Sequence, residues 1–494
     1  MSSKERKNNI NTPLSVKYTT SILELIFQYL TEKEIIRIST CCKAWNTIIR
    51  TSSLAWKYVT LKIVLDSELW ESYFILLDRY KPYFSCISSL DLVVNHIYSY
   101  KSYQLEQLLK YFGNNSKIEQ IEFTFNPKIS KKDICRFLSY FTFPNLKKWT
   151  LNCNYRAQKE YFNLGKLFCH STHLESISLK QGYSGSSMII NHLNGLKKFS
   201  ESLTEVYLDY IYFKKISSLK IINRLQNLRK LTLTNNYFEN LSNITESKQT
   251  NLVEILNSHS HLFSFYKLTS LKELKLRGIE MVYLLPFFIS SSLEQREESR
   301  MKLDKLTLIH HTYSVKDAYY DFYLDLLNQH KEFHFISELI LEFPSKRMVN
   351  NNIFSNFQNL KVCNLRFPSF SFCRRGLISL LAEKNSSSLE QLVINSTQDC
   401  SWMEMENIKK FSKLSYLNLA NTVMLVQEFL EIINWSSLNE IYMEKIKLMD
   451  NFEGMTFSPT PLIWENLKKF PIEYTSHNYD GSKTINYCYK KREI

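Results

Sequence analysis

The chain has 494 residues, of which 44% are hydrophobic and 14% aromatic, and its formal net charge is +14. Its 9 Gly and 10 Pro are too few for a collagen-like, linker-rich or turn-rich β-sandwich protein. The positive charge favours acidic proteins, phosphorylated segments or nucleic acid as partners. Because the Lys and Arg residues are scattered along the chain, an ordinary basic surface is the alternative.

Cysteine usage and apolar runs indicate the compartment. The N-terminal residues 1–17 are polar, are expected to be disordered, and lack the apolar core of a signal peptide. The ten Cys form no CxxC pair, as in proteins of a reducing compartment. The longest apolar run, 281–289, is about half the length of a membrane span. We therefore expect a soluble protein of the cytoplasm and/or the nucleus with no membrane partner.

Residues 18–57 form a first module of three short helical segments. The first segment has apolar residues at the spacing of an amphipathic helix: Ile22, Leu25, Ile26, Tyr29 and Leu30. Thr31 and Glu34 have the spacing of a capping box, which ends this helix and starts the next. A third segment contains Trp45, and Leu54 and Trp56 close the unit. A unit of about 40 residues is marginal alone, so its apolar excess should be covered by a partner, by the following residues, or by both.

From residue 58 to residue 475 the sequence repeats a pattern of the form LxxLxL. Its copies begin at Ile87, Ile118, Leu146, Leu174, Leu203, Leu228, Leu271, Leu303, Ile336, Leu360, Leu389, Leu414, Leu438 and Leu467. The mean period is about 29 residues, and a degenerate copy stands at Tyr58. The fourth and sixth residues of each copy should point into one core from a short strand.

Segments of helical period lie between these copies, at 102–112, 130–141, 316–333, 373–384 and 423–434. Strand and helix in alternation predict an α/β leucine-rich-repeat solenoid, a horseshoe of about 14 irregular repeats. Asn95, Asn154 and Asn236 occupy the ninth position, where an amide can satisfy backbone groups at the turn leaving the strand. Residues 476–494 are expected to form a C-terminal tail.

One interval, from Leu228 to Leu271, is longer than the period. The extra residues at about 237–260 are interpreted as a solvated insertion, which costs little loop entropy. The alternative is a recognition loop carried by a rigid scaffold.

The sequence contains no catalytic constellation. It has no phosphate-binding glycine loop, nucleophile elbow or HExxH motif, so we expect no catalytic residue, no cofactor and no enzyme activity. The pairs His259/His261 and His310/His311, and the group Cys169, His170 and His173, lack a second ligand pair at a metal-binding spacing. We expect no metal site.

The variable strand positions on the concave face are candidates for partner binding. The middle repeats carry basic residues there, namely Lys148, Lys180, Lys230, Lys275, Arg277 and Lys305, with Glu205, Asp209 and Glu273 interspersed. The later repeats offer Glu338, Glu342, Glu440 and Glu444. We therefore expect an acidic or phosphorylated protein segment to dock on the basic centre through charge-assisted hydrogen bonds. A solvated face of mixed charge is the alternative.

The first module resembles the F-box in its helix Ile22–Leu30, its middle helix, the CKAW of Cys42–Trp45, and the LAW of Leu54–Trp56. It departs from the family at Tyr18-Thr19, where Leu-Pro is usual, and by the extra residue in LAW. The resemblance implies that the module binds a Skp1-type adaptor. The residues that match adaptor-contacting or supporting positions are Ile22, Leu23, Phe27, Leu30, Cys42, Lys43 and Trp45.

The whole chain resembles an F-box and leucine-rich-repeat protein. The resemblance implies the substrate receptor of a Skp1–cullin–F-box ubiquitin ligase, whose repeats hold an unknown protein substrate. One alternative is a repeat scaffold or inhibitor whose N-terminal helices only cap the solenoid. A nucleic-acid-binding protein is less favoured, because basic residues are not clustered with aromatic ones.

Overall fold

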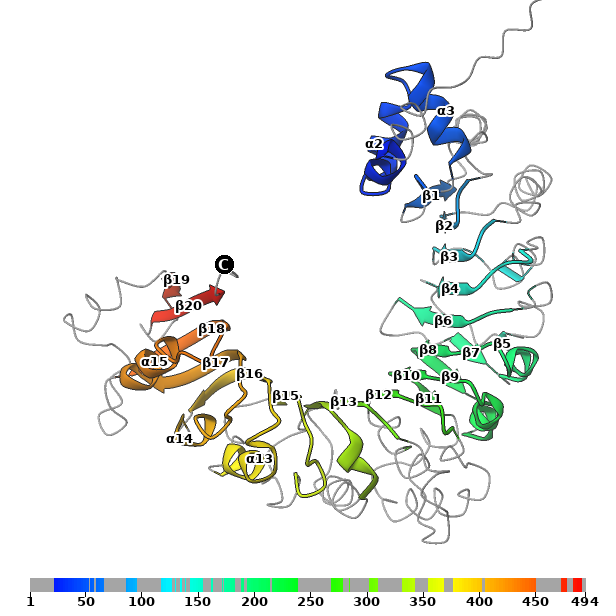
Figure 1. The fold of residues 1–494 in the computed structure, drawn as a ribbon. Coiled ribbons are helices and arrows are strands. Elements are labelled where there is room, and N and C mark those ends of the chain that lie inside the picture. The colour runs from blue at the N-terminus through cyan, green and yellow to red at the C-terminus, as the bar shows by residue number, and fades with distance from the viewer. Residues whose placement is uncertain are drawn as a thin grey trace, which may run out of the picture. The chain divides into compact units, whose positions relative to one another are not determined.

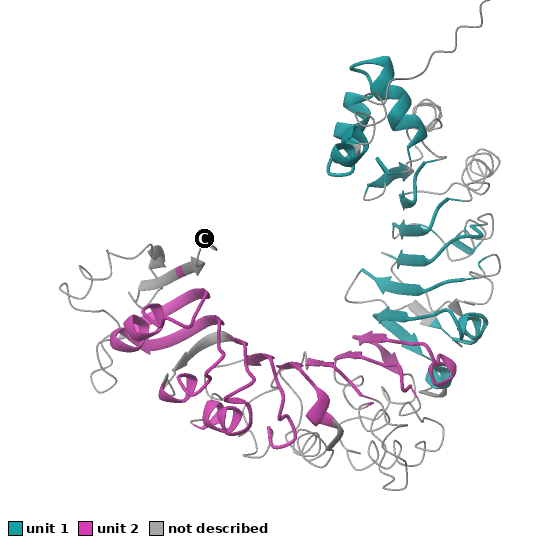
Figure 2. Ribbon diagram, viewed as in Figure 1, with its two compact units in different colours: residues 1–221 teal, residues 222–494 magenta. Residues whose placement is uncertain are grey.

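The computed structural model describes residues 22–52, 54–56, 59–65, 86–95, 117–126, 129, 134–135, 138, 143–153, 161–162, 171, 173–182, 188–190, 193–213, 216–238, 268–278, 284, 302–309, 331–342, 354–367, 376–401, 405–449, 472–477 and 483–490. The chain divides into two compact units, Met1–Ile221 and Ile222–Ile494 (Figures 1 and 2). Each unit contains a ladder of parallel strands, one from each repeat.

The first unit begins with the helical module and continues into the ladder. After a first helix at residues 22–27 come α2 (Glu32–Ile38) and α3 (Lys43–Thr51). The parallel strands are β1 (Thr60–Leu65), β2 (Ser89–Val94), β3 (Gln120–Phe125), β4 (Lys148–Cys153), β6 (Ser176–Gln181) and β8 (Glu205–Asp209). A second small parallel sheet contains β5 (Tyr161–Phe162), β7 (Met188–Ile190) and β9 (Ile211–Phe213).

The second unit continues the same pattern. Its parallel strands are β10 (Lys230–Thr234), β12 (Glu273–Arg277), β13 (Lys305–Ile309), β14 (Glu338–Glu342), β15 (Val362–Phe367), β16 (Gln391–Ser401), β17 (Tyr416–Leu425) and β18 (Glu440–Met449). A short strand, β11, covers Tyr237–Phe238. The prediction of an α/β leucine-rich-repeat solenoid is confirmed by these ladders.

The repeat motif explains the core. In β10 and β12 the fourth and sixth residues, Leu231, Leu233, Leu274 and Leu276, are all buried, as is the first residue, Leu228. The third, fifth and seventh residues of each repeat lie on the opposite side of the strand, which we call the open face. This is the face that the sequence predicts to be concave.

Backbone hydrogen bonds fix the register between repeats. The carbonyl of the second residue of a repeat accepts two N–H groups from the next repeat. Lys272 O, for example, accepts from Asp304 N at 2.8 Å and from Lys305 N at 3.0 Å. The steps from β2 to β8 and from β10 to β18 reuse this arrangement, so equivalent positions of successive repeats lie side by side within each unit.

The eighth position of several repeats holds a residue in the left-handed backbone conformation. Tyr210, Asn235, Asn421 and Lys445 have φ between 50° and 55°, and Gly278 has φ 92°. The ninth position carries Asn95, whose Oδ1 accepts from the equivalent Asn126 at 3.4 Å, and Asn236, which is buried. Asn154 lies outside the described residues.

Helices and 3-10 turns connect the strands of the ladders. They are η4 (Asn194–Phe199), η5 (Ile216–Arg224), η9 (Lys331–Phe335), α13 (Leu377–Asn385), α14 (Met405–Ile408) and α15 (Val426–Ile433). α13 and α15 correspond to the helices predicted at 373–384 and 423–434, but residues 423–425 belong to β17. The predicted helix 102–112, most of 316–333 and the insertion after Phe238 lie outside the described residues. Among the helices that the structure describes, none is long and apolar enough to cross a membrane.

The C-terminal region differs from the repeats before it. β19 (Ile472–His477) and β20 (Lys483–Lys490) are antiparallel, and β20 pairs with β18. The motif predicted to begin at Leu467 therefore leads into an antiparallel strand. The residues expected to be a tail contain β20, whose Tyr487 is buried and packs edge-on against Phe429 of α15 at a centroid distance of 5.8 Å.

Candidate functional site

The first helix carries an exposed apolar stripe. In the described part of the chain seven large hydrophobic side chains are exposed, and four of them lie here. The exposed fractions are 57% for Ile22, 51% for Leu25, 50% for Ile26 and 84% for Tyr29. Ile22, Leu25 and Ile26 have the spacing i, i+3 and i+4 of one helix face, and Tyr29 lies in the turn that follows the helix. We call these four residues the apolar stripe; exposed apolar groups gathered in this way mark interaction sites.

The opposite side of the first helix is held by packing. Phe27 is 2% exposed, and its ring lies edge-on to that of Trp45 with centroids 6.0 Å apart. Burial of this aromatic pair fixes the first helix on α3. The stripe therefore faces away from the module's own core.

The capping box predicted at the start of α2 is confirmed. Thr31 N donates to Glu34 Oε2 at 2.8 Å, and Glu34 N donates to Thr31 Oγ1 at 3.4 Å. Hydrogen bonds from the Thr31 backbone and side chain lower the pKa of the Glu34 carboxyl. Both orphan N–H groups are thereby satisfied, which sets the angle between the first helix and α2.

Helix α3 is closed at both ends by side chains. Cys42 is its N-cap, and Trp45 N donates to Cys42 Sγ at 3.4 Å. At the C-terminus the Ile49 carbonyl accepts from Trp56 Nε1 at 2.8 Å, and the Arg50 carbonyl accepts from Cys86 Sγ at 3.0 Å. Cys86 comes just before β2, so the first repeats satisfy carbonyls that the helix leaves open.

The residues predicted from the F-box resemblance fall into three groups by their exposure. Ile22, Cys42 and Lys43 are exposed, whereas Leu23, Leu30 and Trp45 are half-buried. Phe27 is buried and supports the module from inside. The sequence predicts Leu25, Ile26 and Tyr29 only as part of an amphipathic helix, yet they are exposed. Their apolar spacing is the sequence signal for this candidate surface.

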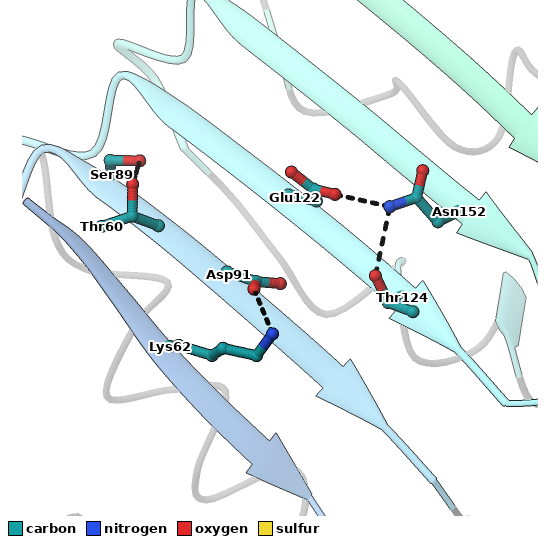
Figure 3. A network of polar contacts seen from close by, with 7 residues as sticks. All are labelled: Thr60, Lys62, Ser89, Asp91, Glu122, Thr124 and Asn152. Carbon is teal, nitrogen blue, oxygen red and sulfur yellow. Dashed lines mark hydrogen bonds and ion pairs between the residues drawn. The ribbon is translucent and has the colours of Figure 1, made fainter. Parts of the chain in front are cut away.

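Polar contacts cross the open face of the first unit. Thr60 and Ser89 are hydrogen-bonded at 2.9 Å, and Lys62 Nζ lies 3.3 Å from Asp91 Oδ2 (Figure 3). Asn152 Nδ2 donates to Glu122 and to Thr124, the latter at 3.2 Å. These contacts join neighbouring strands, as side-chain pairs across a sheet do.

The surroundings of Asp91 shift the pKa of its carboxyl. Burial raises the pKa of its carboxyl, and Glu122 adds to the effect, whereas Lys62 acts in the opposite direction. The Asp91 side chain is 18% exposed and that of Lys62 is 58% exposed. The carboxylate is therefore partly desolvated without full compensation from its partner.

Two of the six predicted basic residues lie on the first unit. Lys148 is exposed on β4. Lys180 on β6 is half-buried, and its Nζ stands 5.3 Å from the centroid of the Tyr207 ring, within range of a cation–π contact.

The other four predicted basic residues lie on β10, β12 and β13. At the third repeat position the register places Lys230, Glu273, Lys305 and Glu338 in a row. Lys230 Nζ lies 3.0 Å from Glu273 Oε2, and Lys305 is paired with Glu338. The expected basic centre is thus an alternating row of cations and carboxylates.

The two remaining cations sit beside this row. Lys275 is half-buried and lies in register between Thr232 and Thr307, both of which are buried. Arg277 is half-buried. Burial raises the pKa of Glu342, whereas the positive charges of Arg366 and Arg277 lower it. The carboxylate of Glu342 in turn opposes part of the positive charge of Arg277.

The metal-binding side-chain types of the described residues are also predicted not to form a site. His, Cys, Asp and Glu side chains there do not gather in groups of three that could hold a metal ion. His259, His261, His310, His311, Cys169 and His170 lie outside the described residues. Burial raises the pKa of the Cys153 and Cys363 thiols, which keeps them protonated and inert.

The comparisons with known proteins agree with the geometry of the module. Residues 20–62 match the F-box-like family model. Comparison with curated proteins gave no match. Among solved structures, the chain is similar to the crystal structure of an internalin from Listeria monocytogenes, with 12% identity, a TM-score of 0.34, and coverage of 77% of this chain and 80% of that one.

The matched family and the strand ladders together define the class of protein. The chain carries an F-box-like module at residues 20–62, and leucine-rich repeats follow it. Proteins of this class mediate protein interactions.

Proposed function

We propose that the chain is the substrate-recognition subunit of a Skp1–cullin–F-box ubiquitin ligase. The F-box-like module would bind the Skp1 adaptor and the repeats a protein substrate. The chain itself would perform no chemistry, since the rate gain comes from bringing substrate and ubiquitin donor together. It would act in the cytoplasm and/or the nucleus.

The apolar stripe is the observation that carries this proposal. Ile22, Leu25, Ile26 and Tyr29 are exposed on the module that matches the F-box-like family. Such a surface costs free energy in water, at about 25 cal/mol for each Å² left uncovered. A helical adaptor that buries the stripe would recover that free energy.

Aspartate substitutions on the stripe test the proposal. Because Leu25 and Ile26 are exposed, Leu25→Asp and Ile26→Asp should change the stability of the protein by less than about 1 kcal/mol. Recovery of Skp1 and a cullin with the tagged full chain should fall at least about tenfold. Val64→Asp is the matched control, since Val64 is also an exposed aliphatic residue but lies on β1.

Two outcomes would reject the proposal. One is that the folded wild-type protein recovers no Skp1. The other is that the stripe variants recover as much Skp1 as the Val64→Asp control.

A scaffold or inhibitor with an N-terminal helical cap is the second candidate. It is favoured by the way Trp56 and Cys86 close the end of α3, because a terminal cap must seal the first repeat. Under this function the stripe variants would leave every interaction of the repeats unchanged, and no cullin would be recovered.

A further inference from the structure

The open face of the second unit changes character from one strand to the next. The third repeat position alternates Lys and Glu from β10 to β14, whereas the fifth position from β14 to β18 carries no charge. Its residues lie side by side in register: Ile340, Asn364, Val393, Asn418 and Tyr442. With Tyr416 of β17 they form what we call the tyrosine–asparagine patch. All six residues are half-buried, so each offers part of its side chain to a partner.

The two tyrosines of the patch are held in place. Their rings lie 5.5 Å apart between centroids at an angle of 37°. Asn418 Nδ2 donates to the Tyr416 hydroxyl at 3.3 Å, and the Tyr442 hydroxyl donates to Glu440 Oε2 at 3.4 Å. Aromatic side chains that are already ordered lose little conformational entropy on binding, which makes them good anchors.

Two pairs of opposite charge flank the patch. They are Glu342 with Arg366, which lie in register, and Glu444 with Lys445 at 3.7 Å. Glu440 accepts the hydrogen bond from Tyr442. The patch itself carries no charged side chain, which favours an uncharged ligand. Charge depletion and enrichment in Tyr are also the marks of the centre of a protein interface.

We propose that the tyrosine–asparagine patch binds an extended, uncharged segment of a protein partner. The partner would be the substrate, so the inference rests on the proposed function. Four strand spacings of about 4.8 Å separate β14 from β18, and this distance of about 19 Å corresponds to about six extended residues. Val393 and the tyrosine rings would pack against apolar side chains of the segment. The side-chain amides of Asn364 and Asn418 would form hydrogen bonds with its backbone groups.

Peptide selection with the full chain tests the proposal. A displayed library of random eight-residue peptides is selected on the immobilised protein, and the affinity of each enriched peptide is measured by fluorescence anisotropy. Enriched peptides should share an uncharged core of about six residues. Val393→Asp and Tyr442→Ala should each weaken their binding at least about tenfold.

Controls separate binding from folding. Ser178→Asp makes the same kind of change at the fifth position of β6 in the first unit and should alter affinity less than about twofold. Melting temperatures of all variants show that each one folds. Tyr442→Ala introduces no charge, so it keeps the test valid should Val393→Asp fail to fold.

Three results would overturn the proposal. Enriched peptides that bind the patch variants as tightly as the wild type would show that the patch is not the site. If the enriched peptides are acidic and Lys275→Glu abolishes their binding, the site lies on β10, β12 and β13 instead of the patch. Self-association of the wild type that Val393→Asp abolishes would make the occupant a second copy of the chain.

Skp1 recovery separates this inference from the proposed function. Val393→Asp should recover as much Skp1 as the wild type, because Val393 lies outside the F-box-like module. If peptides bind through the patch while the wild type recovers no Skp1, the ubiquitin role fails and the docking site is supported.

Discussion

Replacement of Trp56 by phenylalanine isolates one hydrogen bond inside the F-box-like module, at the C-terminal end of α3. Trp56 is fully buried, and its indole N–H donates to the carbonyl of Ile49, which is also buried. Phenylalanine keeps most of the ring but removes the donor. A buried carbonyl left without a partner costs about 1–3 kcal/mol. We expect the end of α3 to open more easily by that amount, while the remainder of the fold keeps its stability.

Hydrogen exchange measured by mass spectrometry reports this local opening. Since 1.4 kcal/mol is a factor of ten, amides of α3 should exchange about 5 to 150 times faster in Trp56→Phe. Trp45→Phe is the matched control: Trp45 is half-buried in the same module and contacts Phe27 through its ring. It should accelerate exchange less than about fivefold. Equal exchange in Trp56→Phe and the wild type would refute the argument that the indole closes α3.

Three further substitutions test the fold and its electrostatics. Gly278 has φ 92°, and an added Cβ would lie 3.3 Å from Asn235 Cα. Gly376 has a similar φ of 101°, but its added Cβ would meet nothing within 4 Å. Gly278→Ala should therefore lower the melting temperature more than Gly376→Ala. We expect a cost of about 1–3 kcal/mol at Gly278, and equal shifts would contradict the contact with Asn235. Asn385 is fully buried, donates to Phe357 O and accepts from Leu360 N; Asn385→Leu should cost about 3–5 kcal/mol in urea unfolding, and an unchanged midpoint would contradict this role. Burial raises the pKa of Asp91 in the folded state, so its ionisation opposes folding as pH rises above the usual Asp range near about 3.9. Asp91→Asn should melt higher than the wild type at pH 7, and the gain should vanish at acidic pH; a gain independent of pH would contradict it.

The repeat architecture was predictable because one short motif specifies both the strand and its buried side. Leu228, Leu231 and Leu233 are buried as the pattern requires, and the capping box at Thr31 has the expected bonds. The start of α15 was predicted three residues early. Residues 423–425 are apolar and fit either a strand or a helix, and their pairing with β18 decides for the strand.

The sequence shows the pairing of charges between neighbouring repeats only when the repeats are aligned. At the third position Lys230, Glu273, Lys305 and Glu338 alternate in sign, and each residue lies beside the next in the ladder. Counting basic residues strand by strand overstates the positive potential, because such ion pairs cancel it locally. An acidic or phosphorylated partner would have to compete with Glu273 and Glu338 for their lysines, and each exposed pair is worth about 0.2–1 kcal/mol.

The apolar stripe shows what periodicity cannot decide. Ile22, Leu25, Ile26 and Tyr29 have the spacing of a face that packs on the module's own core, yet Phe27 packs there and the stripe is exposed. An apolar period identifies a face that must be covered, but it does not say by which chain.

The two candidate functions make different demands on the same small module. Cys86, just before β2, donates to the Arg50 carbonyl at the end of α3, so removal of the whole module would expose the first repeats whether or not the module binds an adaptor. A deletion therefore cannot separate an adaptor-binding module from a cap. Leu25 and Ile26 lie on the exposed side, away from that junction, and a cap gains nothing from them. Substitution of these two residues should weaken adaptor binding and leave a capping function unchanged.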